Sequence, residues 1–147
     1  MLRSQQPLLL QHNFSTKNNS VDRFYPMNIR KTFGSNGEAH IAQFLEKQGY
    51  AILARNYRKP YGELDLVAKK DQELVFVEVK TRSSSYIEPE YLISRAQQRK
   101  IIATAKAYIA EYDLMEYVWR FDAALLIGNP PHQKLTYIPN AFTQEEE

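Results

Sequence analysis

Two strand-like runs separated by a very short turn constrain the fold of this 147-residue chain more than any other feature. Residues 63–69 and 73–81 are rich in branched apolar side chains and flank Asp71 and Gln72, which predicts an antiparallel hairpin. If the loop holds an even number of residues centred there, one set of alternate side chains shares a single face of the sheet. The facing pairs of that set are Val67 with Phe76, Asp65 with Glu78, and Glu63 with Lys80.

The two opposed carboxylates are the most informative part of this hairpin. Opposed Cβ atoms in an antiparallel pair lie about 5 Å apart, so Asp65 and Glu78 can hold one ion between them. Apolar residues surround the two acids, since Val67 and Phe76 share their face and the other face carries Leu64, Leu66, Val75, Val77 and Val79. Because ionised carboxylates are costly in such surroundings, the pattern favours a divalent metal site.

The ligand types narrow the choice of metal. Hard oxygen ligands with no His or Cys nearby in the sequence indicate Mg²⁺ or Mn²⁺. Lys80 would stand beside a metal-bound water. A lattice of cross-strand salt bridges is the alternative, and it accounts for Lys80 as a partner of Glu63. It leaves Asp65 opposite Glu78 as a repelling pair, so the metal site explains more of the pattern.

The rest of the chain places this hairpin in a domain of the α/β class, mixed α+β in character. Ser35 or Asn36 can begin a helix over residues 38–48 that ends at Gly49, and Glu38 shares the side of the helix that faces the core. A second helix is expected over about residues 92–112, and further strands over 50–56, 119–127 and 134–138. The order αβββαββ predicts a central mixed sheet flanked by helices.

We expect one folded domain over residues 36–142. Residues 1–35 are rich in Gln, Asn and Ser without sustained apolar periodicity, so they are expected to form a disordered extension. Translation from Met27 would remove most of that segment. Residues 143–147 form a short acidic tail that ends in three glutamates.

Composition excludes several classes of protein. The chain has no cysteine, which excludes disulfide scaffolds and thiolate chemistry and suits the cytoplasm. Its five glycines cannot form either common glycine-rich phosphate loop, so no nucleotide cofactor is expected. No apolar run approaches the ~20 residues that span a membrane. The net charge of +2 is small, so a nucleic-acid-binding surface would need its positive charge gathered on one face.

Several motifs resemble a known nuclease superfamily. Asp65, Glu78 and Lys80 in the pattern D-x(12)-E-x-K, with Glu38 in the preceding helix, resemble the PD-(D/E)xK nucleases of restriction-endonuclease-like fold. More closely, residues 28–142 resemble the YraN-type, endonuclease-like family of bacterial proteins. The motifs that carry this likeness are Gly37-Glu38-Ala39, Gly49-Tyr50, Arg55-Asn56-Tyr57-Arg58, Gly62-Glu63-Leu64-Asp65-Leu66, Phe76-Val77-Glu78-Val79-Lys80-Thr81-Arg82 and Arg120-Phe121-Asp122.

The resemblance implies an αβββαβ core and a metal-dependent reaction. Phosphodiester bonds would be hydrolysed with Mg²⁺ or Mn²⁺, leaving a 5′-phosphate and a 3′-hydroxyl. Asp65, Glu78 and the carbonyl of Val79 would bind the metal. Lys80 would assist the attacking water, and Glu38 would complete the acidic cluster from the first helix.

Other residues have less specific expected roles. Relatives often carry a lysine where this chain has Gln97, so Gln97 is an accessory candidate together with Glu63. Lys100 can replace the missing charge, although a solvated helix surface also explains it. Arg120 and Asp122 share a face of their strand and are interpreted as structural. The candidates for phosphate contact are Arg55, Arg58, Lys59, Arg82, Arg95 and Arg99.

Two functions remain open at this point. The first is a metal-dependent nuclease that acts on DNA, including branched or recombining DNA. The second is a non-catalytic nucleic-acid-binding or assembly module that kept the fold. The sequence leaves open whether the substrate is DNA or RNA, and whether the protein forms a homodimer.

Overall fold

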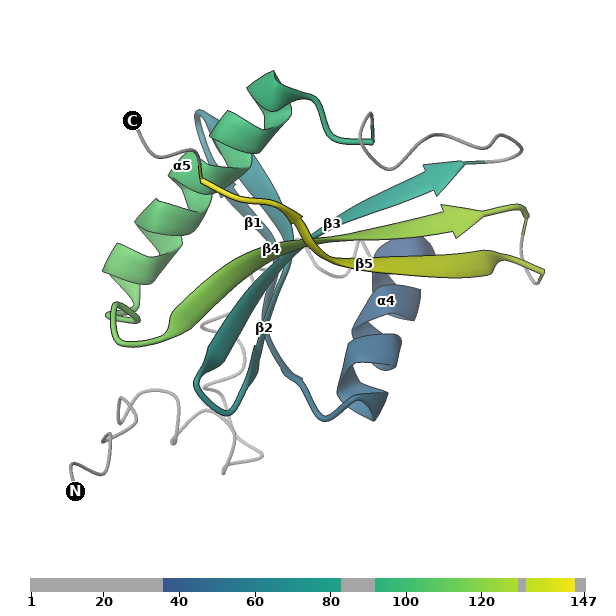
Figure 1. Cartoon of the computed structure of the whole chain (residues 1–147), viewed down its shortest axis with the longest axis horizontal. Helices are drawn as coiled ribbons and strands as arrows, with labels where there is room; N and C mark the ends of the chain where they lie inside the picture. The colour runs from purple at the N-terminus through teal and green to yellow at the C-terminus, as the bar shows by residue number, and fades with distance from the viewer. Residues whose placement is uncertain (1–35, 83–91, 130–131, 145–147) are drawn as a thin grey trace.

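The computed structural model describes residues 36–82, 92–129 and 132–144, and over these ranges the chain forms two helices and one five-stranded sheet (Figure 1). The elements are α4 (Asn36–Lys47), β1 (Ala51–Lys59), β2 (Gly62–Lys70), β3 (Glu73–Arg82), α5 (Arg95–Glu111), β4 (Val118–Ile127) and β5 (Lys134–Phe142). The expected N-terminal extension and residues 145–147 of the acidic tail lie outside the described residues. Neither helix in the described ranges is long and apolar enough to cross a membrane.

The strands lie side by side in the order of the sequence, from β1 to β5. The pairing is antiparallel throughout except between β3 and β4, which run parallel. A parallel pair needs a long crossover connection, and α5 lies within it. This mixed sheet between two helices is the predicted restriction-endonuclease-like αβββαβ core, with β5 added beside β4.

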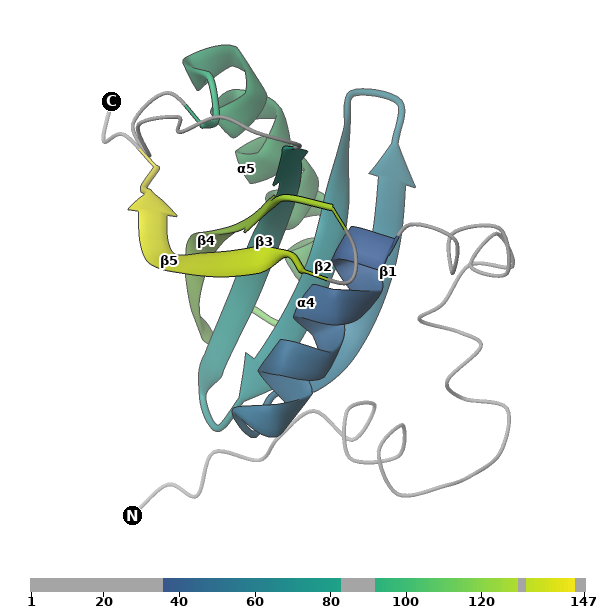
Figure 2. The ribbon, with the colours of Figure 1, turned by 90° about the vertical axis from the view of Figure 1, so that its right-hand side faces the viewer.

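The two helices cover opposite faces of the sheet (Figures 1 and 2). The predicted stripe of α4, formed by Ile41, Ala42 and Leu45, is buried against Leu66, Val75, Val77 and Leu126. On the other face, α5 buries Ile101, Ala105, Tyr108 and Ile109 against Val67, Phe76 and Phe121. Each face is therefore a separate apolar layer, and the central strands β2 and β3 are covered on both sides.

The predicted register of the β2–β3 hairpin is confirmed as far as its ladder extends, which does not include the predicted pairs Asp65 with Glu78 and Glu63 with Lys80. Val67 faces Phe76, and the ladder extends to the pair Leu66 and Val77. Asp71 in the turn has a φ of 53°, which an aspartate tolerates better than most residues.

One expectation for the reverse face is wrong. Leu64 packs with the layer under α5 instead of the layer under α4. Beyond Leu66 the paired ladder with β3 ends, while β2 still pairs with β1 as far as Gly62. Two-stranded ribbons twist more strongly than broad sheets, so simple alternation relative to the helices is lost there.

Glycine allows close approach of each helix to the sheet near the ends of β2 and β3. A Cβ on Gly62 would lie 2.3 Å from Thr104 Oγ1 and 2.9 Å from the carbonyl oxygen of Lys100, both in α5. A Cβ on Gly37, in the first turn of α4, would lie 2.8 Å from Thr81 Oγ1 at the end of β3. Both helices are therefore held tightly against this end of the sheet.

Three element boundaries differ from the predictions by three or more residues. Helix α5 begins after Ser94, whose hydroxyl oxygen accepts a hydrogen bond from the Gln97 backbone N–H, so it starts later than residue 92. Strand β1 continues past Asn56, where φ is 50°, to Lys59. Strand β5 continues past Ile138 to residue 142 because a register shift accommodates the interruption and pairing resumes between Phe121 and Phe142.

Candidate functional site

A cavity of about 500 Å³ lies between β2, β3 and the start of α5. Its lining includes five polar or charged side chains that the sequence indicated as candidates for the site: Glu63, Asp65, Glu78, Gln97 and Lys100. The predicted hairpin register and the position of α5 together produce this arrangement. The cavity therefore brings the two candidate metal-binding carboxylates together, and we refer to it as the acidic pocket.

Asp65 lies one residue beyond Leu66, the last β2 residue that pairs with β3. Its Oδ2 accepts a hydrogen bond of 2.8 Å from the backbone N–H of Val79, so the side chain bridges to β3 where the ladder ends. Burial and then the negative charge of Glu78 raise the pKa of Asp65 to about 8, against the opposing effect of the Val79 N–H. A carboxylate in this position is costly without a cation.

Glu78 is held from two sides. Its Oε1 lies 3.0 Å from Lys80 Nζ, and it also accepts a hydrogen bond of 2.8 Å from Gln97 Nε2 of α5. The side chains of Glu78 and Lys80 retain only 10% and 17% of their exposure, so this ion pair is largely desolvated. The accessory candidate Gln97 thus contacts a candidate metal ligand directly.

Glu38 reaches the same region from the opposite side of the sheet. Its Oε2 accepts a hydrogen bond of 2.9 Å from Asn56 Nδ2, which ties the start of α4 to β1. Its negative charge also contributes to raising the pKa of Asp65. The structure therefore brings Glu38 close enough to act electrostatically on Asp65.

The salt bridge between Glu63 and Lys80, which the alternative to a metal site required, does not form. Glu63 pairs instead with Arg58 of β1 at 3.2 Å, and Lys80 pairs with Glu78 of its own strand. The reason is the early end of the β2–β3 ladder, beyond which Glu63 remains next to β1 alone.

Within the described ranges, no group of three or more His, Cys, Asp or Glu side chains is placed to hold a metal ion. The carboxylates of Asp65 and Glu78 line one cavity, and the resemblance adds the Val79 carbonyl as a third donor. Mg²⁺ commonly binds through one or two carboxylates and keeps several waters, so this donor set is compatible with it.

The six candidates for phosphate contact come from β1, the end of β3 and α5. Arg58 and Lys59 at the end of β1 already have acidic partners, since Lys59 lies 3.4 Å from Glu111. Arg82 donates to the carbonyl of Thr81, and Arg55 is half-buried on β1. Arg95 and Arg99 line a second cavity of about 300 Å³ together with Lys106 and residues 143–144. Of the basic side chains in α5, Lys100 is the one that lines the acidic pocket.

The sequence also matches a described protein family. The model of "Uncharacterised protein family UPF0102" matches residues 37–126, which contain all four candidate catalytic residues. The chain belongs to this family. UPF0102 is the YraN-type, nuclease-like family of the restriction-endonuclease-like superfamily, as the motifs predicted.

Individual relatives match most of the chain. The UPF0102 protein of Alkaliphilus metalliredigens is 43% identical over 116 residues, which cover 78% of this chain and 100% of that protein. The UPF0102 protein of Caldanaerobacter subterraneus is 41% identical over 117 residues, covering 77% and 96%. That of Myxococcus xanthus is 36% identical over 114 residues, covering 77% and 90%.

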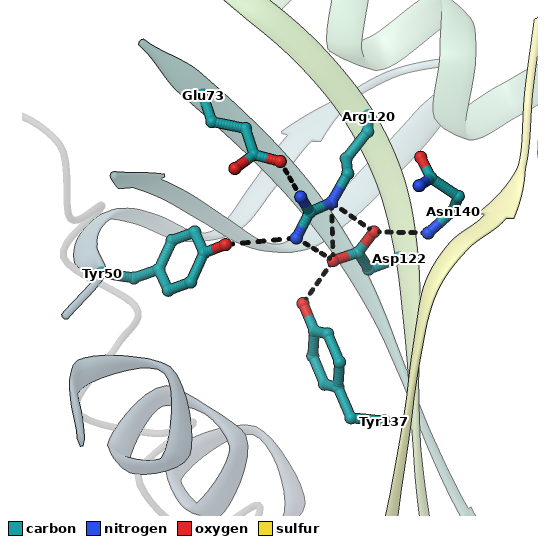
Figure 3. A network of polar contacts seen from close by, with 6 residues as sticks. All are labelled: Tyr50, Glu73, Arg120, Asp122, Tyr137 and Asn140. Atoms are coloured by element: carbon teal, nitrogen blue, oxygen red, sulfur yellow. Dashed lines mark hydrogen bonds and ion pairs between the residues drawn. The ribbon is translucent and has the colours of Figure 1, made fainter. Parts of the chain in front are cut away.

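This UPF0102 protein contains a second polar cluster, away from the acidic pocket (Figure 3). The side chain of Asp122 in β4 is fully buried and accepts hydrogen bonds from Arg120, the Tyr137 hydroxyl and the Asn140 backbone N–H. Arg120 also donates to the Tyr50 hydroxyl and pairs with Glu73. The sequence indicated Arg120 and Asp122 as a structural pair, but it carried no signal for their partners. The cluster connects β3, β4, β5 and the segment after α4.

Proposed function

We propose that this UPF0102 protein is a metal-dependent nuclease that hydrolyses phosphodiester bonds in nucleic acid, with DNA as the expected substrate. The observation that carries the proposal is the placement of Asp65 and Glu78 in one cavity, with Lys80 Nζ 3.0 Å from Glu78. The cysteine-free chain suits the cytoplasm, where such a substrate is present.

The donor set supports Mg²⁺ or Mn²⁺ as the cofactor. Asp65 is largely buried beside the second carboxylate, and its pKa of about 8 reflects the cost of holding both charges without a cation. Asp65, Glu78 and the Val79 carbonyl would hold the metal. When bound, the metal would supply a water of lowered pKa and neutralise charge on the phosphate.

The protein's own side chains account for positioning. Lys80 can release Glu78 and present its ammonium group to the attacking water or to the phosphate. Gln97 fixes one carboxylate oxygen of Glu78 and leaves the other free to act as a ligand. Lys100 lines the same cavity and can contribute the positive charge that position 97 lacks.

Cleavage of linear, flapped and four-way DNA with Mg²⁺, Mn²⁺ or chelator tests the proposal. The parent should cleave at least one substrate with metal and none with chelator. Asp65→Asn and Glu78→Gln should lose cleavage, while Glu46→Gln, which removes an exposed acid of α4, should retain it. Unchanged cleavage by Asp65→Asn would refute the proposed site.

A non-catalytic nucleic-acid-binding module is the second candidate function. One observation favours it, because Lys80 and Gln97 already satisfy Glu78 without a metal. Metal-independent binding of the same DNA panel without cleavage would support this alternative. Size-exclusion chromatography with light scattering on the same samples tests whether the protein forms a homodimer.

A further inference from the structure

The turn between β1 and β2 presents an exposed aromatic ring next to the acidic pocket. Tyr61 is 49% exposed, and within the described part of the chain only Met115 and Val118 are other large apolar residues with such exposure. Those two lie near the start of β4, whereas Tyr61 directly precedes two pocket-lining residues, Gly62 and Glu63. The β1–β2 turn and the start of α5 lie at the same end of the molecule (Figure 2).

The turn is rigidly supported. Pro60 precedes Tyr61 and fixes its own φ angle. On the other side, Gly62 lies so close to Thr104 and the Lys100 carbonyl that a Cβ there would overlap with both. The backbone that carries the ring is therefore held close to α5 and the pocket, which lowers the entropy lost when a ligand binds there.

The charges of the turn do not favour a phosphate ligand. Arg58 pairs with Glu63, and Lys59 pairs with Glu111. Each cation that flanks Tyr61 is thus balanced by a carboxylate, so the turn offers an aromatic face with little net positive charge. An aromatic face binds nucleic acid by stacking on a base, and it needs a base whose own face is uncovered.

We propose that Tyr61 stacks on an unpaired base of the substrate, beside the phosphate that enters the acidic pocket. This inference rests on the proposed nuclease function and names its substrate class, which is nucleic acid with unpaired bases, as in single strands, flaps and junctions. Bases within a continuous duplex are covered by their neighbours and present no free face to the ring. Stacking is also insensitive to salt, unlike phosphate binding by the arginines of α5.

Fluorescence anisotropy with a labelled oligo-dT strand and a labelled duplex whose two ends are sealed by non-nucleotide linkers tests this inference. Ca²⁺ replaces Mg²⁺ to slow cleavage, and the affinity is measured over a series of salt concentrations. Tyr61→Ala should weaken binding of oligo-dT about tenfold, without changing its salt slope or the affinity for the sealed duplex. Tyr61→Phe, which keeps the ring, and Met115→Ala, the matched exposed control, should bind like the parent.

The outcomes separate this inference from the proposed function. If Tyr61→Ala binds oligo-dT as tightly as the parent while the parent cleaves DNA, stacking is refuted and the nuclease proposal stands. An equal loss for both probes, with a changed salt slope, would show a backbone contact and would also refute stacking. If the parent binds neither probe and cleaves nothing, both proposals are wrong. Melting temperatures of all four proteins confirm that the variants fold.

Discussion

Replacing Asp65 by asparagine should stabilise the metal-free protein, and the gain should grow with pH. Asparagine keeps the size of the side chain and an oxygen that can accept the hydrogen bond from the Val79 N–H. It removes a negative charge that burial and Glu78 make costly. The variant therefore isolates the electrostatic cost of the acidic pocket from its packing.

The pKa of Asp65 sets the sign and the size of this effect. Its usual value of 3.8 applies to the unfolded chain, whereas the folded pKa is about 8. Between these values the folded protein holds a proton that the unfolded chain has released, so the parent loses about 1.4 kcal/mol of stability per pH unit as pH rises. The variant lacks this loss. The free energy of unfolding of Asp65→Asn should exceed that of the parent by at most about 4 kcal/mol at pH 7. This difference should stop growing above pH 8.

Urea unfolding of both proteins in chelator, at intervals from pH 4 to pH 9, measures this difference. Asp71→Asn is the matched control, because it removes an exposed acid from a turn whose positive φ asparagine also tolerates. A difference between Asp65→Asn and the parent that stays constant over this pH range would refute the reasoning. Adding Mn²⁺ at pH 8 should stabilise the parent and leave Asp65→Asn unchanged, since the proposed ligand is gone.

Three further predictions concern the pocket and its support. Lys80→Ala should bind Mn²⁺ at least as tightly as the parent in a calorimetric titration but cleave about 10²- to 10⁴-fold more slowly. Glu78→Ala should lose both Mn²⁺ binding and cleavage. Normal cleavage by Lys80→Ala would instead show that the lysine is a structural counter-ion. Gly62→Ala should lower the free energy of unfolding by about 1–3 kcal/mol in urea, because the added methyl group overlaps with α5, and an unchanged value would show that α5 moves freely. In the same assay, Asp122→Ala should lower the free energy of unfolding by about 3–5 kcal/mol and Tyr137→Phe by about 1 kcal/mol. Equal losses would contradict the interpretation that the buried charge of Asp122 organises this cluster.

The central hairpin could be predicted from sequence because its register depends on local information. A short turn at Asp71 and Gln72 fixes the facing pairs as far as Leu66 and Val77, and Asp65 and Glu78, the next residues along each strand, line one cavity. The family motifs added the fold class, which the αβββαβ core confirms. The catalytic and metal-binding roles of these residues stay predictions.

The same reasoning failed where pairing between strands ends. Leu64, Glu63 and Lys80 were assigned by extending the hairpin register beyond the pair Leu66 and Val77, and all three have other neighbours. Strand twist decides their contacts, and twist depends on the number of strands present at each level. The start of α5 was missed although Ser94, with Gln97 three residues later, is a helix-start signal.

The cluster around Asp122 shows a different limit, since its partners come from distant parts of the chain. Tyr50 follows α4, Glu73 begins β3, and Tyr137 and Asn140 lie in β5, and no spacing rule connects these three segments. The buried carboxylate also explains why β5 continues beyond Ile138. Asp122 Oδ1 accepts from the Asn140 N–H at 2.9 Å where Asn140 has a φ of 50°, so the irregular backbone is satisfied.

Helix α5 packs next to both the acidic pocket and the turn that carries Tyr61. Its buried side packs against the sheet, while Gln97 and Lys100 face the acidic pocket and Arg95 and Arg99 line the second cavity. Because Gly62 holds this helix against β2 next to Tyr61, the two cavities and the exposed ring keep fixed relative positions. A bound strand would therefore meet salt-sensitive arginines on one side of α5 and a salt-insensitive stacking contact on the other. The salt-independent part of the binding free energy, obtained by extrapolating the affinity to high salt, should therefore be more favourable for unpaired than for fully paired substrates.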